Sequence, residues 1–285
     1  MSSPVAAGTP ARTRAGPRIV HRRHWGAWAV GALVLLVLAV LVKAGVSARI
    51  VEPGIVARYI FSAQIVTGAV NSLALGTVAL LIAVAVGLVT ALMRVSGNPI
   101  LGAVSAGYVY LFRGTPMLIQ LIFWFNAFPT MFKQLHLEFA GFVLVSVPMT
   151  ELVTPYAAAL LGLSLAEGAY MAEIIRGGIL AVDAGQRDAA RSLGMTSGQL
   201  MRRIVIPQAS RIIVPATGNQ YIMLLKSTSL ASTIGYLELL RIATDIYASN
   251  FRVVELLTVA AFWYLVMTAF ATALQAALER RFPHR

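Results

Sequence analysis

The stretch GQRDAARSLGMTSGQLMRRIVIPQA, residues 185–209, is polar and rich in arginine, whereas the sequence on both sides of it is strongly apolar. Over the 285-residue chain, 58% of residues are hydrophobic, only 12% are charged and the mean hydropathy is +0.78. A soluble globular domain has about 25% charged residues. The chain is therefore predicted to be an integral membrane protein, and residues 185–209 are predicted to form a polar surface that docks another molecule.

Two pairs of residues predict that this segment forms two short helices. Asp183 with Gln186, and Thr196 with Gln199, have the spacing of an N-cap residue and the glutamine that pairs with it three positions later. Gly194 lies between the two pairs, and glycine readily adopts the positive φ that ends a helix and turns the chain. We therefore expect a helix, a turn at Gly194 and a second helix.

The far end of the segment is marked by Pro207, which either closes the second helix or begins the next apolar one.

Ala189 and Ala190 are small enough to let another surface approach closely. A simpler interpretation is an ordinary basic loop, because lysine and arginine collect on the cytoplasmic side of membrane proteins in any case. The charges that would orient a docking partner are Arg187, Asp188, Arg191, Arg202 and Arg203.

The order and spacing of these residues resemble the EAA signature of ABC-importer permeases. The matching positions are Asp188-Ala189-Ala190, Gly194, Ile204 and Ile206-Pro207. Aspartate stands where that family usually has glutamate, and Ile206 stands where it usually has leucine. Three further stretches look like the polar amino-acid uptake branch, and the resemblance covers roughly residues 68–277. These stretches are FRGTPMLIQ (112–120), AYMAEIIRGGI (169–179) and NQYIMLLKSTSLAS (219–232).

The resemblance implies a permease subunit that forms the path for polar amino acids and couples it, by alternating access, to a separate ABC ATP-binding subunit. That subunit would hold ATP and Mg²⁺, and this chain would hold no cofactor. None of its lysines follows a glycine, so the phosphate-binding Gly-Lys-Ser/Thr motif is missing. An extracytoplasmic amino-acid-binding protein and a second permease chain, identical or different, are the other implied partners. The implied coupling residues are Arg187, Asp188, Ala189, Ala190, Gly194, Arg202, Arg203, Ile204 and Pro207.

The expected fold class is all-α, a polytopic transmembrane helical bundle with about six spans, of which five form a type I importer core and one precedes it. A bilayer core requires about 20 mostly apolar residues per helix. Residues 139–150 are too few to cross, so we expect an external or re-entrant piece there. Pro116 is expected to kink the third span. The six spans are residues 25–46, 63–93, 101–128, 155–175, 212–230 and 256–278.

These segments divide the chain into consecutive parts. Residues 1–24 are expected to be a basic, disordered cytoplasmic tail, and 25–62 the first transmembrane helix with an external linker. Residues 63–278 form the permease domain, whose cytoplasmic coupling loop is 183–209, and 279–285 form a second cytoplasmic tail.

The distribution of positive charge predicts the topology. Six spans place both termini and the coupling loop on one side, and most of the 23 lysine and arginine residues fall on that side. The positive-inside rule makes it cytoplasmic, so we expect a multi-pass protein of the bacterial inner membrane. Residues 11–23 are expected to contact anionic membrane lipid, and the net charge of +12 requires no nucleic acid. The first span could instead be a cleaved signal peptide, because two arginines precede it and residues 46–48 resemble a cleavage site.

Ionisable residues inside predicted spans are functional candidates, because placing a charge in hydrocarbon is costly. Lys226 and Glu167 would complement the two charges of an amino acid. Alternatively, Lys226 has a structural role at the outer end of its helix, and Arg113 extends its charged end to the membrane interface. Glu173 and Arg176 are three residues apart and are predicted to form a structural ion pair. The candidate substrate path is Arg113, Glu167, Asn219, Gln220, Lys226, Ser227 and Thr228.

Other features narrow the function classes. Cysteine is absent and the four histidines lack ligand spacing, so neither disulfides nor a metal site is expected. A secondary transporter driven by an ion gradient remains an alternative, although it commonly shows repeated halves that are not evident here.

Small residues recur every four positions in the second span and predict close helix packing, within the chain or with a second permease. They are Gly68, Ser72, Gly76, Ala83, Gly87 and Ala91.

Overall fold

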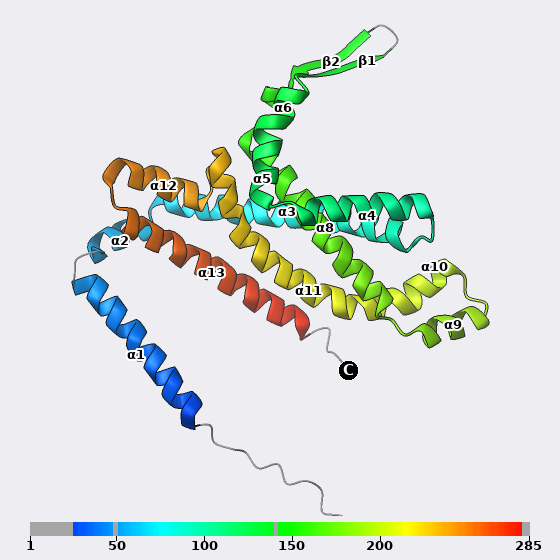
Figure 1. Ribbon diagram of the computed structural model, residues 1–285, viewed down its shortest axis with the longest axis horizontal. Helices are drawn as coiled ribbons and strands as arrows, with labels where there is room; N and C mark the ends of the chain where they lie inside the picture. The colour runs from blue at the N-terminus through cyan, green and yellow to red at the C-terminus, as the bar shows by residue number, and fades with distance from the viewer. Residues whose placement is uncertain (1–24, 48–50, 140–141, 281–285) are drawn as a thin grey trace, which may run out of the picture. The chain divides into compact units, whose positions relative to one another are not determined.

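The computed structural model describes residues 25–47, 51–139 and 142–280 and divides the chain into two units, with the boundary between Ile50 and Val51. The first unit contains α1 (Trp25–Ser47), a single helix of 23 residues. The second unit contains every other labelled element (Figure 1). The predicted tails, apart from residues 279 and 280, lie outside the described residues, as does residue 48 of the cleavage-like sequence.

Helices dominate the second unit, in agreement with the expected helical bundle. Three of the described helices are long and apolar enough to cross a membrane: α3 (Ala63–Val95), α8 (Pro155–Leu180) and α13 (Val253–Glu279). A fourth, α11 (Ile206–Ser227), has 22 residues, is more polar and contains Pro215. The structure therefore supports several spans without confirming that there are six.

The predicted third span is broken rather than kinked. It divides into α4 (Pro99–Gly114) and α5 (Met117–Ile122), and Figure 1 shows α5 leaving the line of α4 at a steep angle. The cause is Pro116, because the ring of a proline disfavours the helical conformation in the residue before it. Thr115 is accordingly extended, with φ −108° and ψ 139°. The Gln120 side-chain amide of α5 spans the break by donating to the carbonyls of Phe112 in α4 and of Thr115, at 2.9 and 3.1 Å.

The mostly helical fold agrees with the all-α expectation, and the sequence analysis missed one element, a β-hairpin that follows the broken helix. Its strands pair antiparallel, with Leu135 opposite Val147 and an irregularity at Leu137/Glu138. Alternating β-branched residues in the second strand favour this extended form over a helix. The elements of this region are η1 (Phe123–Ala127), α6 (Phe128–Met131), β1 (Gln134–Phe139), β2 (Phe142–Pro148) and α7 (Met149–Leu152).

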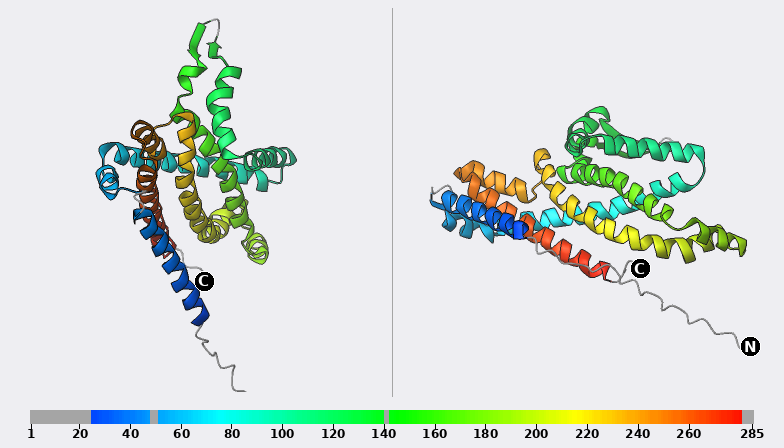
Figure 2. Two further views of the ribbon diagram at one scale, coloured as in Figure 1. Left: turned by 60° about the vertical axis from the view of Figure 1, so that its left-hand side comes forward. Right: turned by 60° about the horizontal axis from the view of Figure 1, so that its bottom comes forward.

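The small residues of α3 allow very close helix packing within the chain. A Cβ atom added to Gly87 would lie 2.6 Å from Met171 Cβ on α8, and one added to Gly76 would lie 2.9 Å from a Leu225 methyl on α11. A Cβ atom added to Gly68 would lie 2.9 Å from the backbone Cα of Leu239. All six predicted small residues are buried, so the predicted close packing is confirmed and occurs inside this chain. Beside these helices, α11 and α13 run next to one another (Figure 2).

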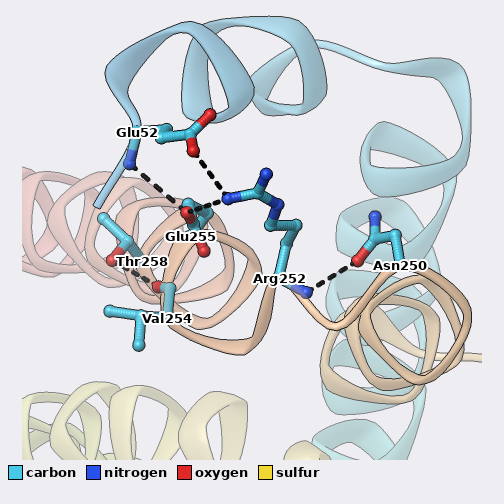
Figure 3. A network of polar contacts seen from close by, with 6 residues as sticks. All are labelled: Glu52, Asn250, Arg252, Val254, Glu255 and Thr258. Atoms are coloured by element: carbon cyan, nitrogen blue, oxygen red, sulfur yellow. Dashed lines mark hydrogen bonds and ion pairs between the residues drawn. The ribbon is translucent and has the colours of Figure 1, made fainter. Parts of the chain in front are cut away.

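One end of the unit is built by α2 (Pro53–Ile60), α12 (Leu239–Asn250) and the start of α13. Figure 3 shows the ion pair there, in which Arg252 Nη1 lies 2.8 Å from Glu52 Oε1. Glu255 is only 4% exposed, and its Oε1 accepts from the Glu52 backbone N–H at 3.3 Å. These contacts fasten α2 to the first turn of α13.

A second carboxylate at this end, Glu238, is completely buried between η3 (Thr228–Ile234) and α12. It accepts hydrogen bonds from Tyr264 Oη at 2.8 Å and from Ser72 Oγ at 3.3 Å. As the N-cap of α12 it also accepts from the first backbone N–H groups of that helix, at 2.7 and 2.9 Å. Burial raises the pKa of the Glu238 carboxyl, and these hydrogen bonds oppose that rise. Glu238 thus joins α3, α12 and α13 at one point.

Candidate coupling surface and polar path

The predicted pair of short helices is present as α9 (Ala184–Ser192) and α10 (Ser197–Leu200). Thr196 and Gln199 form a complete capping box, with N–H to side-chain oxygen distances of 3.0 and 3.3 Å. Asp183 caps α9 by accepting from the Gln186 N–H at 3.1 Å, without the reciprocal bond. The Gln186 side chain instead accepts from Gln208 Nε2 at 2.6 Å, which connects α9 to α11.

The turn between the two helices is at Gly194, as the sequence predicts. Its φ is +75°, and the N–H groups of Gly194 and Met195 return to the carbonyls of Arg191 and Ala190, both typical of a helix C-terminus. Space around Gly194 is open, since an added Cβ would meet nothing within 4 Å. Only backbone strain therefore opposes a larger side chain there.

The second short helix continues into α11 through η2 (Met201–Val205), a π-helical turn. Pro207 lies in the first turn of α11, so it begins the apolar helix and does not close the previous one. A proline has no N–H to return to the carbonyl four residues earlier, and the wider π turn accommodates that loss. The chain is helical from Ser197 to Ser227.

A small apolar core supports the α9–α10 segment, which we define as residues 183–209. Ala190 is 2% exposed and belongs to this core with Val182 and Val205. Ala190 is therefore not available to an approaching partner, contrary to the sequence interpretation, whereas its neighbour Ala189 is exposed. The helical period explains the difference, because adjacent residues point about 100° apart.

The exposed face of the segment includes a residue that sequence reasoning missed. Leu193 is 83% exposed at the tip, next to Gly194. Arg202 and Arg203 border an open hollow of about 650 Å³ beside the capping box. Asp188 and Arg191 form an exposed pair at 3.2 Å. The face thus presents an apolar tip flanked by positive charge, and the position of Leu193 before a turn-forming glycine was the available signal.

The candidate path residues fall into separate groups. Glu167 is 3% exposed, its Oε1 has no hydrogen-bond partner among the described residues, and the Gln220 side chain lies beside its carboxyl group. Asn219 Oδ1 accepts from Gln275 Nε2 of α13 at 3.0 Å. Lys226 is exposed. Glu167 and Gln220 are therefore brought together, whereas Lys226 is not buried with them.

The two hydroxyl groups after Lys226 donate hydrogen bonds to backbone carbonyls three or four residues earlier in the chain. Ser227 Oγ donates to the Met223 carbonyl at 3.1 Å, and Thr228 Oγ1 donates to the Leu225 carbonyl at 2.7 Å. Thr228 is completely buried. Both groups can still accept a hydrogen bond, but only the partly buried Ser227 is open to a solute.

A cavity of about 470 Å³ lies between α3, α8, α11 and α13. Its walls are mostly apolar, with polar side chains from Thr77, Thr217, Tyr221, Gln275 and Glu279. Thr77 Oγ1 and Tyr221 Oη are 2.7 Å apart, which joins α3 to α11. These five residues come from three helices, so no local sequence pattern could have identified them.

Arg113 lies elsewhere, in a groove formed by α3, α4 and α8. Its guanidinium carbon is 5.0 Å from the centre of the Tyr170 ring, a cation–π distance. Glu173 and Arg176 form the ion pair that their spacing predicts, with three N–O distances between 2.7 and 3.2 Å. No group of acidic, histidine or cysteine residues suited to a metal occurs within the described part of the chain.

Residues 83–284 match the family described as binding-protein-dependent transport system inner membrane component. The arginine transport system permease protein ArgU of Corynebacterium glutamicum is 39% identical over 277 residues, covering 96% of this chain and 86% of that protein. The glutamine transport system permease protein GlnP of Escherichia coli K12 is 32% identical, covering 76% of this chain and 92% of that protein.

Solved structures of ABC transporters are also similar to this chain. One described as an amino acid ABC transporter with histidines is 36% identical, has a TM-score of 0.66, and covers 76% of this chain and 94% of its own. The MetNI methionine ABC transporter, inward facing, is 20% identical with a TM-score of 0.60, covers 78% of this chain and 97% of its own, and supports the fold alone.

Proposed function

This chain belongs to the family of binding-protein-dependent transport system inner membrane components, and on that premise we propose that it carries polar amino acids into the cell. As a member of that family it is an integral inner-membrane permease subunit of an ABC transporter, and ATP hydrolysis lies in a separate subunit. The family works with an ATP-binding subunit and a substrate-binding protein. Relatives named for arginine and for glutamine transport support an amino acid as the solute.

The observation that carries the coupling proposal is the continuous helix from α10 through η2 into α11. The ATP-binding subunit, with its ATP and Mg²⁺, docks on Ala189, Leu193 and the arginines of the α9–α10 segment. Because the segment is capped at both helix starts and fastened by Gln208, it moves as a unit and shifts α11 when the docked subunit changes state. Coupling also requires that the two states of the ATPase contact the segment with different free energies.

The solute passes between α8, α11 and α13, where the partly unsatisfied Glu167 and the Asn219–Gln275 pair are located. Glu167 complements the ammonium group of an amino acid, and Lys226, at the end of α11, attracts its carboxylate. A second permease chain completes the path. Both termini and the α9–α10 segment face the cytoplasm, and residues 11–23 contact anionic lipid.

The test of coupling is Gly194→Glu, in the complex reconstituted with its ATP-binding subunit. Membrane insertion and association with the binding protein should be retained, while transport-linked ATP hydrolysis is lost, because the new side chain strains the left-handed turn and adds negative charge to the docking face. Gly97→Glu is the matched control, since Gly97 has φ +76° and equally open surroundings outside the segment. Normal stimulated hydrolysis in Gly194→Glu would contradict the proposal.

The class of transporter is tested by uptake of labelled amino acids into proteoliposomes. Uptake should require ATP and should disappear with a catalytically inactive ATP-binding subunit. Uptake that ignores the ATPase and follows an imposed ion gradient would instead favour the secondary-transporter alternative.

The path is tested by Lys226→Met. We expect reduced uptake at unchanged membrane abundance, because the charge that attracts the carboxylate is removed. Lys133→Met, a change of another exposed lysine next to the hairpin, is the control and should transport normally. Wild-type uptake by Lys226→Met would exclude this lysine from the path.

A further inference from the structure

An arginine-lined groove between α3, α4 and α8 has no role in the coupling surface or in the Glu167 path. It has a volume of about 430 Å³ and is lined by residues of α4, one residue of α3 and two of α8. The residues used below define this arginine groove: Arg94, Tyr110, Arg113, Tyr170 and Glu173.

The groove has an excess of positive charge. Glu173, its one carboxylate, is already held by Arg176 at 2.7 Å. Neither Arg94 nor Arg113 forms an ion pair with any of the described residues. Arg94 donates once, to the Gly102 carbonyl at 2.8 Å, which leaves further donors of its guanidinium group available. Two guanidinium groups therefore border the groove with a single carboxylate that Arg176 also holds, which leaves the described lining with a net positive charge.

The surroundings of the groove are apolar and face outward. On α4, Val104 is 56% exposed and Leu111 56%, and the helix packs against α3 and α8, two of the candidate spans. Exposed apolar side chains on such a helix are chemically suited to contact lipid acyl chains. Tyr110 is 84% exposed beside them, and tyrosine is favoured at the level of the lipid headgroups. The groove thus combines a cationic centre with an apolar flank.

We propose that the arginine groove binds an anionic phospholipid, with its phosphate between Arg94 and Arg113 and its acyl chains along α4. Arginine donors match phosphate oxygens in pairs, and an unpaired charge beside hydrocarbon is stabilised by such an anion. The apolar flank favours a lipid over a free amino acid, because a solute carboxylate brings no chain to cover it. The lipid site requires only that the chain lies in a bilayer, so it can be tested apart from transport.

The first experiment measures lipid retention by the full chain. The purified protein is exchanged into nanodiscs containing phosphatidylcholine and phosphatidylglycerol, released into detergent, and examined by native mass spectrometry. Wild-type protein should retain phosphatidylglycerol in preference to phosphatidylcholine. Arg94→Gln and Arg113→Gln should each lower that retention by about fivefold, since an arginine near anionic lipid contributes about that factor. Arg113→Lys, which keeps the charge, should restore most of it.

Arg58→Gln is the matched control, because Arg58 also lies over a tyrosine ring, at 5.8 Å, but is outside the groove. It should retain lipid like the wild type. Unchanged retention in the Arg94→Gln/Arg113→Gln double variant would overturn the proposal. So would equal retention of the two lipids by wild-type protein, or displacement of phosphatidylglycerol by inorganic phosphate or by a free amino acid.

A second measurement uses only wild-type protein and so does not depend on the variants folding. A photoactivatable phosphatidylglycerol is added to the nanodiscs, and the crosslinked peptides are mapped. Crosslinks should concentrate on α4 and on α8 near Tyr170. Crosslinks spread evenly over the other exposed apolar helices, with none enriched at α4, would overturn the site.

Discussion

The two ends of the second unit are built in different ways. At one end, the α9–α10 segment exposes most of its charges and is held by local caps and a small apolar core. At the other end, α2, α12 and α13 (Figure 1) surround two buried carboxylates, Glu238 and Glu255. Besides local contacts, each has a partner far away in the sequence: Ser72 for Glu238, and the Glu52 N–H for Glu255 (Figure 3). The difference shows that the exposed α9–α10 segment is held mainly by short-range contacts, whereas the end that joins three helices also needs long-range ones.

The largest expected effect on stability comes from removing a carboxylate at each of the two ends. Glu238→Ala should lower the free energy of unfolding by about 3 kcal/mol, because it removes an N-cap and leaves buried donors of Ser72 and Tyr264 unsatisfied. Asp188→Ala should change it by less than about 0.5 kcal/mol, since Asp188 is exposed. Unfolding by SDS in mixed micelles measures both. Similar losses from the two variants would remove the contrast.

A smaller effect is expected from Thr196→Ala. Loss of the capping hydroxyl should destabilise the start of α10 locally by about 1 kcal/mol, visible as faster amide hydrogen exchange at residues 197–200. Thr244→Ala at the other end is the control, because its hydroxyl only donates to the Leu240 carbonyl of its own helix. Equal acceleration at both sites would show that capping does not hold the segment.

The smallest effect concerns two ion pairs. Arg252→Ala should lower stability by about 1 kcal/mol, because Arg252 bridges α2 to α13 and lies 3.7 Å from the buried Glu255. Arg191→Ala should have almost no effect on stability, since that pair is exposed and within one helix. The same unfolding assay, repeated at high salt, distinguishes them. A loss for Arg191→Ala as large as that for Arg252→Ala would contradict the comparison.

Local sequence patterns were sufficient for the α9–α10 segment and insufficient for the polar path. The two caps and the turn at Gly194 act within four residues, so spacing alone predicts them. Pro116 predicts a distortion of the third span, but the sequence does not show whether the helix bends there or ends at Gly114 and restarts at Met117. The burial of Ala190, the exposure of Leu193 and the meeting of Glu167 with Gln220 depend on how helices pack, which spacing does not encode.

The sequence by itself determined that the chain lies in a membrane, where its polar segment begins and ends, and which face of α3 packs closely. These follow from hydropathy, capping chemistry and residue size, which act locally. The tertiary structure decided which side chains meet. It buried Glu238 among donors from three helices and placed Arg94 and Arg113 around one groove. The physical reason is that such contacts join residues far apart in the chain, whose positions become defined only when the helices pack.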